Sequence, residues 1–219
     1  MSTKEAFVTR YYPYAKKAAD KSGIPVVFAL AQSALESGWG KSAKGNMMFG
    51  IKKGSGVNYG GWQGDTQLIT TTEYLSTATR HFPFIYPGYP KQQSNGKWKY
   101  RVQDYFRAYP NPFYSFMDWA GLLTRNSRYQ YALQYKQEPY RFAEEVAHAG
   151  YATDPYYADK IKRLMKEIEQ IIVLKKLHQK PKNKIIPAIL VGIGAATIAV
   201  TIYIVKPEFL NKIYTYETR

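Results

Sequence analysis

The stretch from Pro25 to Glu36 constrains the fold of this chain more than any other. It reads PVVFALAQSALE and is apolar almost throughout. A short segment without a polar face is a buried helix or a buried strand, and its alanines and leucines, with a proline suited to a first helical turn, favour the helix. The sequence SGWG at 37–40 should end it. We therefore expect a buried helix at the centre of the fold.

Glu36 is the single carboxylate at the end of this apolar helix. Two effects should raise its pKa, which are partial loss of hydration and the negative end of the helix dipole. A carboxylic acid that stays protonated near neutral pH is what a general acid requires. On position alone, an ordinary glutamate at a frayed helix end remains the alternative.

The segments that follow resemble a known family. The runs ALESGWGKS and GNMMFGIK, and later AGYATDPYYADKI, are similar to motifs of the glucosaminidase family, which is related to flagellar peptidoglycan hydrolases and bacterial autolysins. Met47 and Met48 replace the more usual polar–apolar pair of that family. The resemblance extends from Ser2 to Ile171.

This resemblance implies a lysozyme-like fold and hydrolysis of the β-1,4 bond after N-acetylglucosamine in peptidoglycan. Glu36 would be the general acid, and Glu73 in the TTEY motif would activate water or stabilise an intermediate formed by the substrate's acetamido group. Asp104 and Asp65 are rival second acids. Tyr151 would orient the acetamido group or stabilise the transition state. The expected sugar-binding residues are Trp39, Asn46, Phe49, Tyr74 and Tyr151.

The pattern of the remaining helices gives a mostly helical α+β domain. A first helix is expected over 2–21, capped by Ser2 or Thr3, stopped by Gly23 and weakened by Pro13. Asn111-Pro112 should open another helix, and two more should lie between 128 and 150. A last helix is expected over 156–177, capped by Asp154-Pro155.

A small antiparallel β-lobe is expected between these helices. Strands at 68–75 and 97–109 are rich in β-branched and aromatic residues, and Asn95-Gly96 signals a hairpin turn before the second. The glycines between 54 and 64 form a flexible connector. The insert from 76 to 97 departs from shorter family members, so it should alter the wall of the cleft.

The C-terminal part has a different composition. Residues 185–205 are uncharged and match the roughly 20 residues that a helix needs to cross a bilayer. We expect a single-pass, C-terminally anchored membrane protein, with a buried soluble helix as the alternative. The expected parts are a catalytic domain at 1–172, a basic linker at 173–184, a transmembrane helix at 185–205 and a short polar tail at 206–219.

The side of the membrane that the domain faces is open. No secretory signal is expected at the N-terminus, because charges are spread through the first 21 residues. More lysines precede the hydrophobic segment than basic residues follow it, which favours a cytoplasmic domain. Peptidoglycan lies on the other side of the membrane. Either the orientation rule fails here, or the protein meets the wall through a lysis or entry event, which would point to a phage lysis enzyme or a virion component.

Composition limits the alternatives. A formal charge of +15 with 21 tyrosines suits an anionic polymer with flat faces, either wall glycan or single-stranded nucleic acid. There is no cysteine, and the three histidines are scattered, so neither a metal site nor a cofactor is expected. A lytic transglycosylase or a non-catalytic, membrane-anchored wall-binding protein remains possible on the same fold. A nucleic-acid binder would explain the charge but not the motifs.

Overall fold

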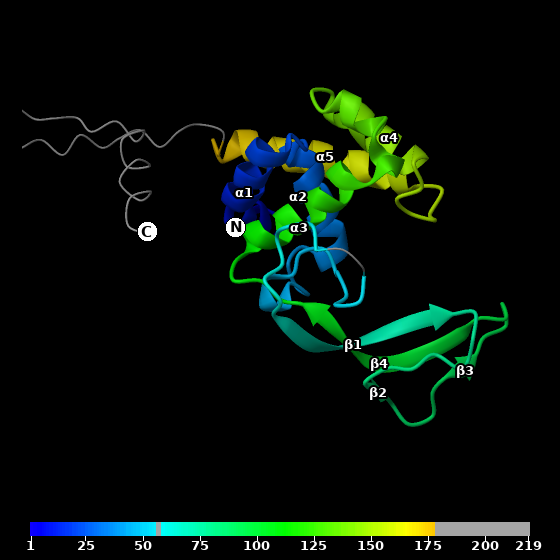
Figure 1. Ribbon diagram of the computed structural model, residues 1–219. Coiled ribbons are helices and arrows are strands. Elements are labelled where there is room, and N and C mark those ends of the chain that lie inside the picture. The colour runs from blue at the N-terminus through cyan, green and yellow to red at the C-terminus, as the bar shows by residue number, and fades with distance from the viewer. Residues whose placement is uncertain (56–57, 178–219) are drawn as a thin grey trace, which may run out of the picture. The chain divides into compact units, whose positions relative to one another are not determined.

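The computed structural model describes residues 1–55 and 58–177, whose helices group together while the strands form a separate β-lobe (Figure 1). The α-helices are α1 (Thr3–Ser22), α2 (Val26–Ser37), α3 (Pro112–Arg125), α4 (Pro139–His148) and α5 (Tyr157–Leu174). Short 3-10 helices lie between them, η1 (Lys44–Asn46), η2 (Ser127–Tyr129) and η3 (Ala132–Tyr135). The strands of the lobe are β1 (Thr66–Leu75), β2 (Phe84–Ile85), β3 (Lys91–Gln92) and β4 (Trp98–Arg107).

Helix α2 is the buried helix that the sequence predicts. Every residue from 27 to 34 is buried, and Phe28 packs between Trp119 of α3 and Phe142 of α4 at ring-centroid distances of 5.7 and 5.0 Å. Burying a side chain of this size contributes about 1.5–3 kcal/mol. Leu35 is exposed, so the helix is not buried on all sides as the sequence suggests. Gly38 ends the helix with a left-handed φ of 57°.

Helix α1 begins and ends as expected. The Ser2 side chain accepts a hydrogen bond from the Glu5 N–H, and the Glu5 carboxylate accepts one from the Ser2 N–H, which together form a capping box. Gly23 ends the helix with a φ of 76°, a conformation that residues with a Cβ rarely adopt. The helix continues through Pro13 and buries one face against the core.

Two predictions in the C-terminal half are wrong in detail. The segment at 127–135 forms the 3-10 helices η2 and η3 instead of an α-helix, because its N–H groups bond to carbonyls three residues earlier, as Gln130 does to Ser127 and Gln134 to Tyr131. Helix α5 begins at Tyr157, and Asp154 lies before it. The Asp154 carboxylate accepts the Tyr156 N–H, so it closes the preceding turn.

In the β-lobe, β4 is the central strand. It pairs antiparallel with β1 along its length, with Thr66 opposite Arg107 and Leu75 opposite Trp98. The short strands β2 and β3 come from the insert and pair with the edge of β4 opposite β1. The Asn95-Gly96 turn that joins β3 to β4 has Gly96 at a φ of 78°, as the hairpin signal predicts.

The insert gives the β-lobe a small core of its own. Tyr100 and Val102 of β4 are fully buried. The Tyr100 hydroxyl donates to the Thr77 carbonyl at 2.9 Å and accepts the Arg80 N–H at 3.3 Å. The Phe82 ring packs on the Tyr100 ring at 5.4 Å. These contacts fold the insert back over one face of the hairpin.

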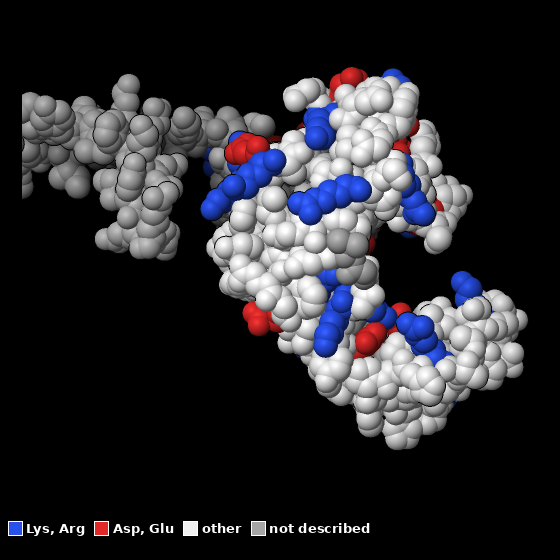
Figure 2. All heavy atoms as spheres, viewed as in Figure 1, with Lys and Arg blue, Asp and Glu red and all other residues white. Residues whose placement is uncertain are grey.

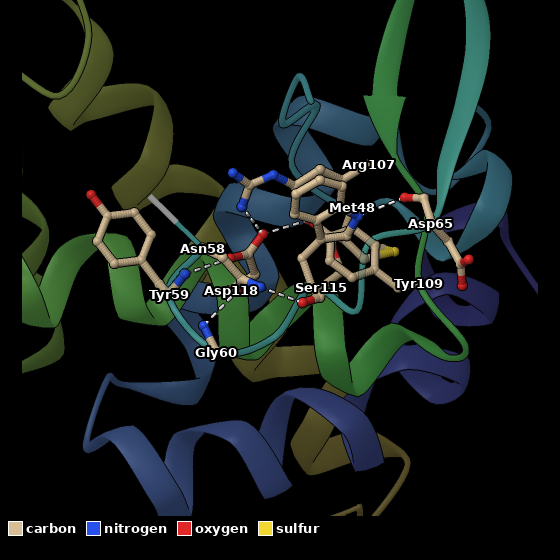
Figure 3. Close-up of polar contacts among 10 residues, drawn as sticks. Met48, Asn58, Tyr59, Gly60, Asp65, Arg107, Tyr109, Ser115 and Asp118 are labelled. Carbon is tan, nitrogen blue, oxygen red and sulfur yellow. Dashed lines mark hydrogen bonds and ion pairs between the residues drawn. The ribbon is translucent and has the colours of Figure 1, made fainter. Parts of the chain in front are cut away.

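Asp118 of α3 attaches the β-lobe to the helices (Figure 3). Its fully buried carboxylate accepts hydrogen bonds from Nη1 of Arg107, the last residue of β4, at 2.7 Å and from the hydroxyl of Tyr109, just after the strand, at 2.8 Å. It also accepts the Tyr59 N–H of the glycine-rich connector at 3.3 Å. Burial, together with the Asp118 charge, raises the pKa of Tyr109, so that hydroxyl keeps its proton and donates.

The connector lies directly on α3 because Gly61 has no side chain. A Cβ at this position would stand 2.2 Å from the Tyr114 carbonyl oxygen and 2.4 Å from the Asp118 nitrogen. The flexible connector that the glycines predict is therefore held closely against α3 over the part that the structure describes.

The predicted membrane segment at 185–205, most of the linker and the tail lie outside the described residues. Within residues 1–55 and 58–177, no helix is both long enough and apolar enough to cross a membrane. The transmembrane helix stays a prediction.

Candidate active site

Glu36 lies in the last turn of α2. Its Oε1 accepts a hydrogen bond of 2.9 Å from Nε2 of Gln32, which lies one helical turn earlier. The Glu36 side chain is open to solvent on one side, while the protein on the other side removes part of its hydration. This burial raises the pKa of Glu36 above its ordinary value. Desolvation, one of the two effects expected from the sequence, is the cause.

Tyr151, in the turn after α4, is linked to Glu36 by Gln32, which forms hydrogen bonds to both residues. Its hydroxyl oxygen accepts a hydrogen bond from Gln32 Nε2 at 3.2 Å and one from Trp119 Nε1 at 2.9 Å. Burial is the main reason that the pKa of Tyr151 is raised, and the charge of Glu36 adds to it. The hydroxyl therefore stays protonated at neutral pH. The structure brings these two predicted site residues together.

Phe49 and Asn46, both predicted to bind sugar, make contacts inside the protein. Phe49 is buried and stacks on the Trp119 ring, with centroids 4.5 Å apart and planes within 1°. The Asn46 side chain donates from Nδ2 to the Tyr109 carbonyl at 2.8 Å, and its φ of 57° lies in the left-handed region. Both residues thus support the loop after α2. Direct contact with a sugar stays a prediction for them.

Trp39 and Tyr74 lie in different surroundings. Trp39 packs edge-on against Phe7 of α1 at 5.5 Å between ring centroids. Tyr74 is exposed on β1, next to Glu73, and neighbouring strand residues point to opposite faces. Its ring therefore lies on the face of the hairpin away from Glu73. A role in sugar binding stays a prediction for both aromatic residues.

Glu73 and its rival Asp104 lie on one face of the hairpin and share a cation. Lys52, from the FGIK segment, places its Nζ 2.9 Å from Glu73 Oε1 and 3.0 Å from Asp104 Oδ2. Burial acts to lower the pKa of Lys52, but the hydrogen bonds and charges of the two carboxylates outweigh it, so its pKa is raised. Asp65 stands apart, at the start of β1, where its backbone carbonyl binds Trp62 and Ala108.

A hollow opens between the helices and the β-lobe, with charged side chains along its β-lobe wall (Figure 2). The cluster of Lys52, Glu73 and Asp104 lines a pocket of about 300 Å³, together with Arg80, His81 and Phe82 of the insert. The insert thus contributes to the pocket wall beside Glu73, as its length suggests. In the described part of the chain, no group of acidic and histidine side chains is placed to hold a metal ion.

The sequence did not predict a role in this site for three residues, which are Gln32, Trp119 and Lys52. A signal for Gln32 is present, because it is an amide in an otherwise apolar helix, at position i−4 from Glu36 and therefore on the same face. Lys52 ends the FGIK motif, but only the folded structure shows that its ammonium lies between the carboxylates of Glu73 and Asp104. Nothing in the sequence distinguishes Trp119 from a core aromatic residue.

Comparison with known proteins decides the family. The profile of the glucosaminidase family, described as mannosyl-glycoprotein endo-beta-N-acetylglucosaminidase, matches residues 12–170. The chain belongs to this family. The peptidoglycan hydrolase FlgJ of Vibrio cholerae is 35% identical over 179 residues, which cover 79% of this chain and 46% of that protein. The probable N-acetylmuramidase of Lactococcus lactis is 29% identical over 175 residues, which cover 76% of this chain and 34% of that protein.

This member of the glucosaminidase family thus spans less than half the length of these two relatives. Among solved structures, the glycoside hydrolase domain of Salmonella typhimurium FlgJ matches with 28% identity and a TM-score of 0.58, over 81% of this chain and 94% of that domain. The predicted lysozyme-like α+β class, with helices and a small antiparallel sheet, is confirmed for the described residues.

Proposed function

We propose that this chain is a peptidoglycan hydrolase that cleaves the β-1,4 bond after N-acetylglucosamine, with Glu36 as the general acid. One observation supports this most. Glu36 stands within the family's ESGWGKS-like segment, and burial raises the pKa of its solvent-accessible carboxyl. A protonated carboxyl open to one side is suited to protonate the leaving glycosidic oxygen.

The second carboxylate of the proposed reaction is Glu73. It activates a water molecule, or stabilises the intermediate that forms when the substrate's acetamido group attacks the anomeric carbon. The Lys52 ammonium lies 2.9 Å from Glu73 Oε1 and holds this carboxylate on the face of the hairpin that lines the pocket. Tyr151 keeps its proton and acts as a hydrogen-bond donor to the substrate beside Glu36.

The products of digestion test the proposed bond. Digestion of purified peptidoglycan by the full chain, followed by borohydride reduction and mass spectrometry, should give fragments with N-acetylglucosamine at the reduced end. Reduced muramic acid would instead indicate the bond named by the Lactococcus lactis relative. Anhydro-muramic ends would indicate a lytic transglycosylase, and absence of any fragments would favour a non-catalytic wall-binding protein.

Substitutions at the two lobe carboxylates test the role of Glu73. We expect Glu73→Ala to lower the rate of hydrolysis by about 10²-fold, within the range for a general base, and azide to restore part of it. Asp104→Asn is the matched control, because it removes the other partner of Lys52 and leaves Glu73 in place. Its rate should stay within about threefold of the unmodified protein.

The opposite pattern would reassign the second carboxylate. If Asp104→Asn loses activity while Glu73→Ala keeps it, Asp104 is the group that acts on the substrate. A small loss in Glu73→Ala without any effect of azide would instead favour assistance by the acetamido group. Release of reducing ends from soluble glycan strands measures all three rates.

We also propose that residues 185–205 anchor the protein in a membrane, in a cell envelope or a phage-infected cell. The support is the uncharged sequence of this segment and the lysines before it. The full chain, expressed in bacteria, should remain with the membrane pellet after alkaline carbonate extraction. Protease protection in spheroplasts should then show a protected domain, as the lysine distribution favours. Recovery of the chain in the carbonate supernatant would exclude the anchor.

A further inference from the structure

Gln32 is a fully buried amide in the middle of the apolar helix α2, and its polar atoms are all engaged. Its Nε2 donates to Glu36 Oε1 at 2.9 Å and to the Tyr151 hydroxyl oxygen at 3.2 Å. Its Oε1 accepts a hydrogen bond from the Tyr157 hydroxyl at 2.7 Å. An amide NH₂ has two donors, and both are used here on residues of the candidate active site.

The direction of this amide follows from its neighbours. Two oxygen atoms, of Glu36 and Tyr151, face one end, so the NH₂ group belongs there. At the other end, burial and the nearby oxygens of Tyr151 and Glu36 raise the pKa of Tyr157, so its hydroxyl keeps its proton and donates to Oε1. Because a buried amide without partners would be unfavourable, this arrangement holds Gln32 in one orientation.

The same bonds direct the proton of Tyr151. Trp119 Nε1 can only donate, and it donates to the Tyr151 oxygen at 2.9 Å. With Gln32 as a second donor, both lone pairs of this oxygen are occupied. The hydroxyl proton of Tyr151 is therefore left to point to a third partner, outside the Gln32–Trp119 pair.

Gln32 also affects the position of the proton on Glu36. The N–H of Gln32 points at Oε1, and a protonated carboxyl accepts a hydrogen bond better at its carbonyl oxygen than at its hydroxyl oxygen. In the acid form this bond therefore favours the proton on Oε2. A single buried amide thus favours one oxygen of Glu36 for the proton and sets the direction in which the hydroxyl of Tyr151 donates.

We propose that Gln32 is a positioning residue for the hydrolysis reaction, which holds Glu36 and Tyr151 side by side with their protons directed to the substrate. This inference rests on the proposed function, because it takes Glu36 as the acid. Gln32 is too deeply buried to touch a glycan strand itself. Its loss should therefore affect the chemical step more than substrate binding, since misalignment of an acid by about 1 Å lowers rates by roughly 10²-fold.

The decisive experiment compares full-chain variants on soluble glycan strands. We expect Gln32→Met, which keeps the length of the side chain and removes its hydrogen bonds, to lower kcat by about 10–100-fold with KM within about twofold. Ser33→Ala is the matched control, because Ser33 is a buried neighbour in α2 whose hydroxyl binds only the Leu30 carbonyl among its described contacts. It should leave both constants near those of the unmodified chain.

A second variant separates positioning from a merely structural role. Tyr157→Phe removes the hydroxyl that holds Oε1 and keeps the ring, which stacks on Tyr151 at 5.6 Å. We expect it to lower kcat by about 3–10-fold. Because Tyr157 acts through Gln32, the double variant should lose no more than Gln32→Met alone. Tyr157→Phe also carries the test if Gln32→Met fails to fold.

Two results would overturn the proposal. One is a kcat for Gln32→Met that equals that of Ser33→Ala, and the other is a double variant whose loss is the product of the two single losses. If Glu36→Gln is inactive while Gln32→Met is fully active, only this inference fails. If Glu36→Gln is itself fully active, the proposed function fails first.

Discussion

We expect Glu36→Gln to lower kcat by about 10³–10⁴-fold, the upper part of the range for a general acid. Glutamine has the same shape as protonated glutamate and can still accept the Gln32 hydrogen bond, but it has no acidic proton to give to the leaving oxygen. The fold should be unchanged. Release of reducing ends from purified peptidoglycan measures the rate, and circular dichroism checks the fold. Turnover near that of the unmodified protein would remove Glu36 from the mechanism.

The pH dependence gives an independent check on the same residue. Because the pKa of Glu36 is raised above its ordinary value of 4.5, the acid form persists to higher pH than in a free glutamate, and kcat/KM should fall as pH rises through the raised pKa. The raised pKa of Glu36 also makes the folded protein more stable at low pH than at high pH. This contribution to the free energy of unfolding is fully present below the pKa of Glu36 in the unfolded chain, and it is lost as pH rises through its raised pKa in the folded protein. Glu36→Gln should remove this part of the pH dependence of unfolding.

We expect Asp118→Ala to lower the free energy of unfolding by about 3–5 kcal/mol, because it leaves the buried Arg107 guanidinium without this carboxylate. The Tyr109 hydroxyl and the Tyr59 N–H lose an acceptor in the same change. For a domain of this size the loss corresponds to a fall in Tm of about 6–20 °C. Thermal unfolding followed by circular dichroism measures it.

Asp159→Ala is the control for this prediction. Asp159 lies on α5 with a side chain that is 70% exposed, and it pairs with Lys162 at 3.5 Å. Exposed pairs of this kind contribute about 0–1 kcal/mol, so Tm should change by at most a few degrees. Equal shifts for Asp118→Ala and Asp159→Ala would show that the buried pair does not stabilise the attachment of the β-lobe.

Local sequence signals predicted the elements that local interactions determine. The N-cap at Ser2, one of the two residues expected there, the helix stop at Gly38 and the Asn95-Gly96 turn each follow from residues close together in the chain. The long strands were also predictable, because β1 and β4 have enough β-branched and aromatic residues to set a pattern. In contrast, β2 and β3 are two-residue strands that exist only because β4 provides hydrogen-bond partners.

The site was predictable only in part, for a related reason. Glu36 and Tyr151 are found from motifs, but the contact between them depends on Gln32, whose partners lie on α2, on α5 and after α4. The bridge from Lys52 to Glu73 and Asp104 depends on three segments meeting at the hairpin. Contacts between distant segments leave no pattern in any one of them.

The small core of the β-lobe has a consequence for how the protein opens. Tyr100 and Val102 are buried outside the core of the helices, and Tyr100 contacts the insert. The lobe is tied to the helical part through Asp118 and its partners, and through the 44–53 segment, whose backbone bonds to the end of β4. A segment with its own core can unfold locally as one cooperative unit. In native-state hydrogen exchange, the amides of β1 and β4 should therefore exchange together and earlier than those of α2. The position of Glu73 relative to Glu36 would then depend on a local equilibrium as well as on the packing of the native state.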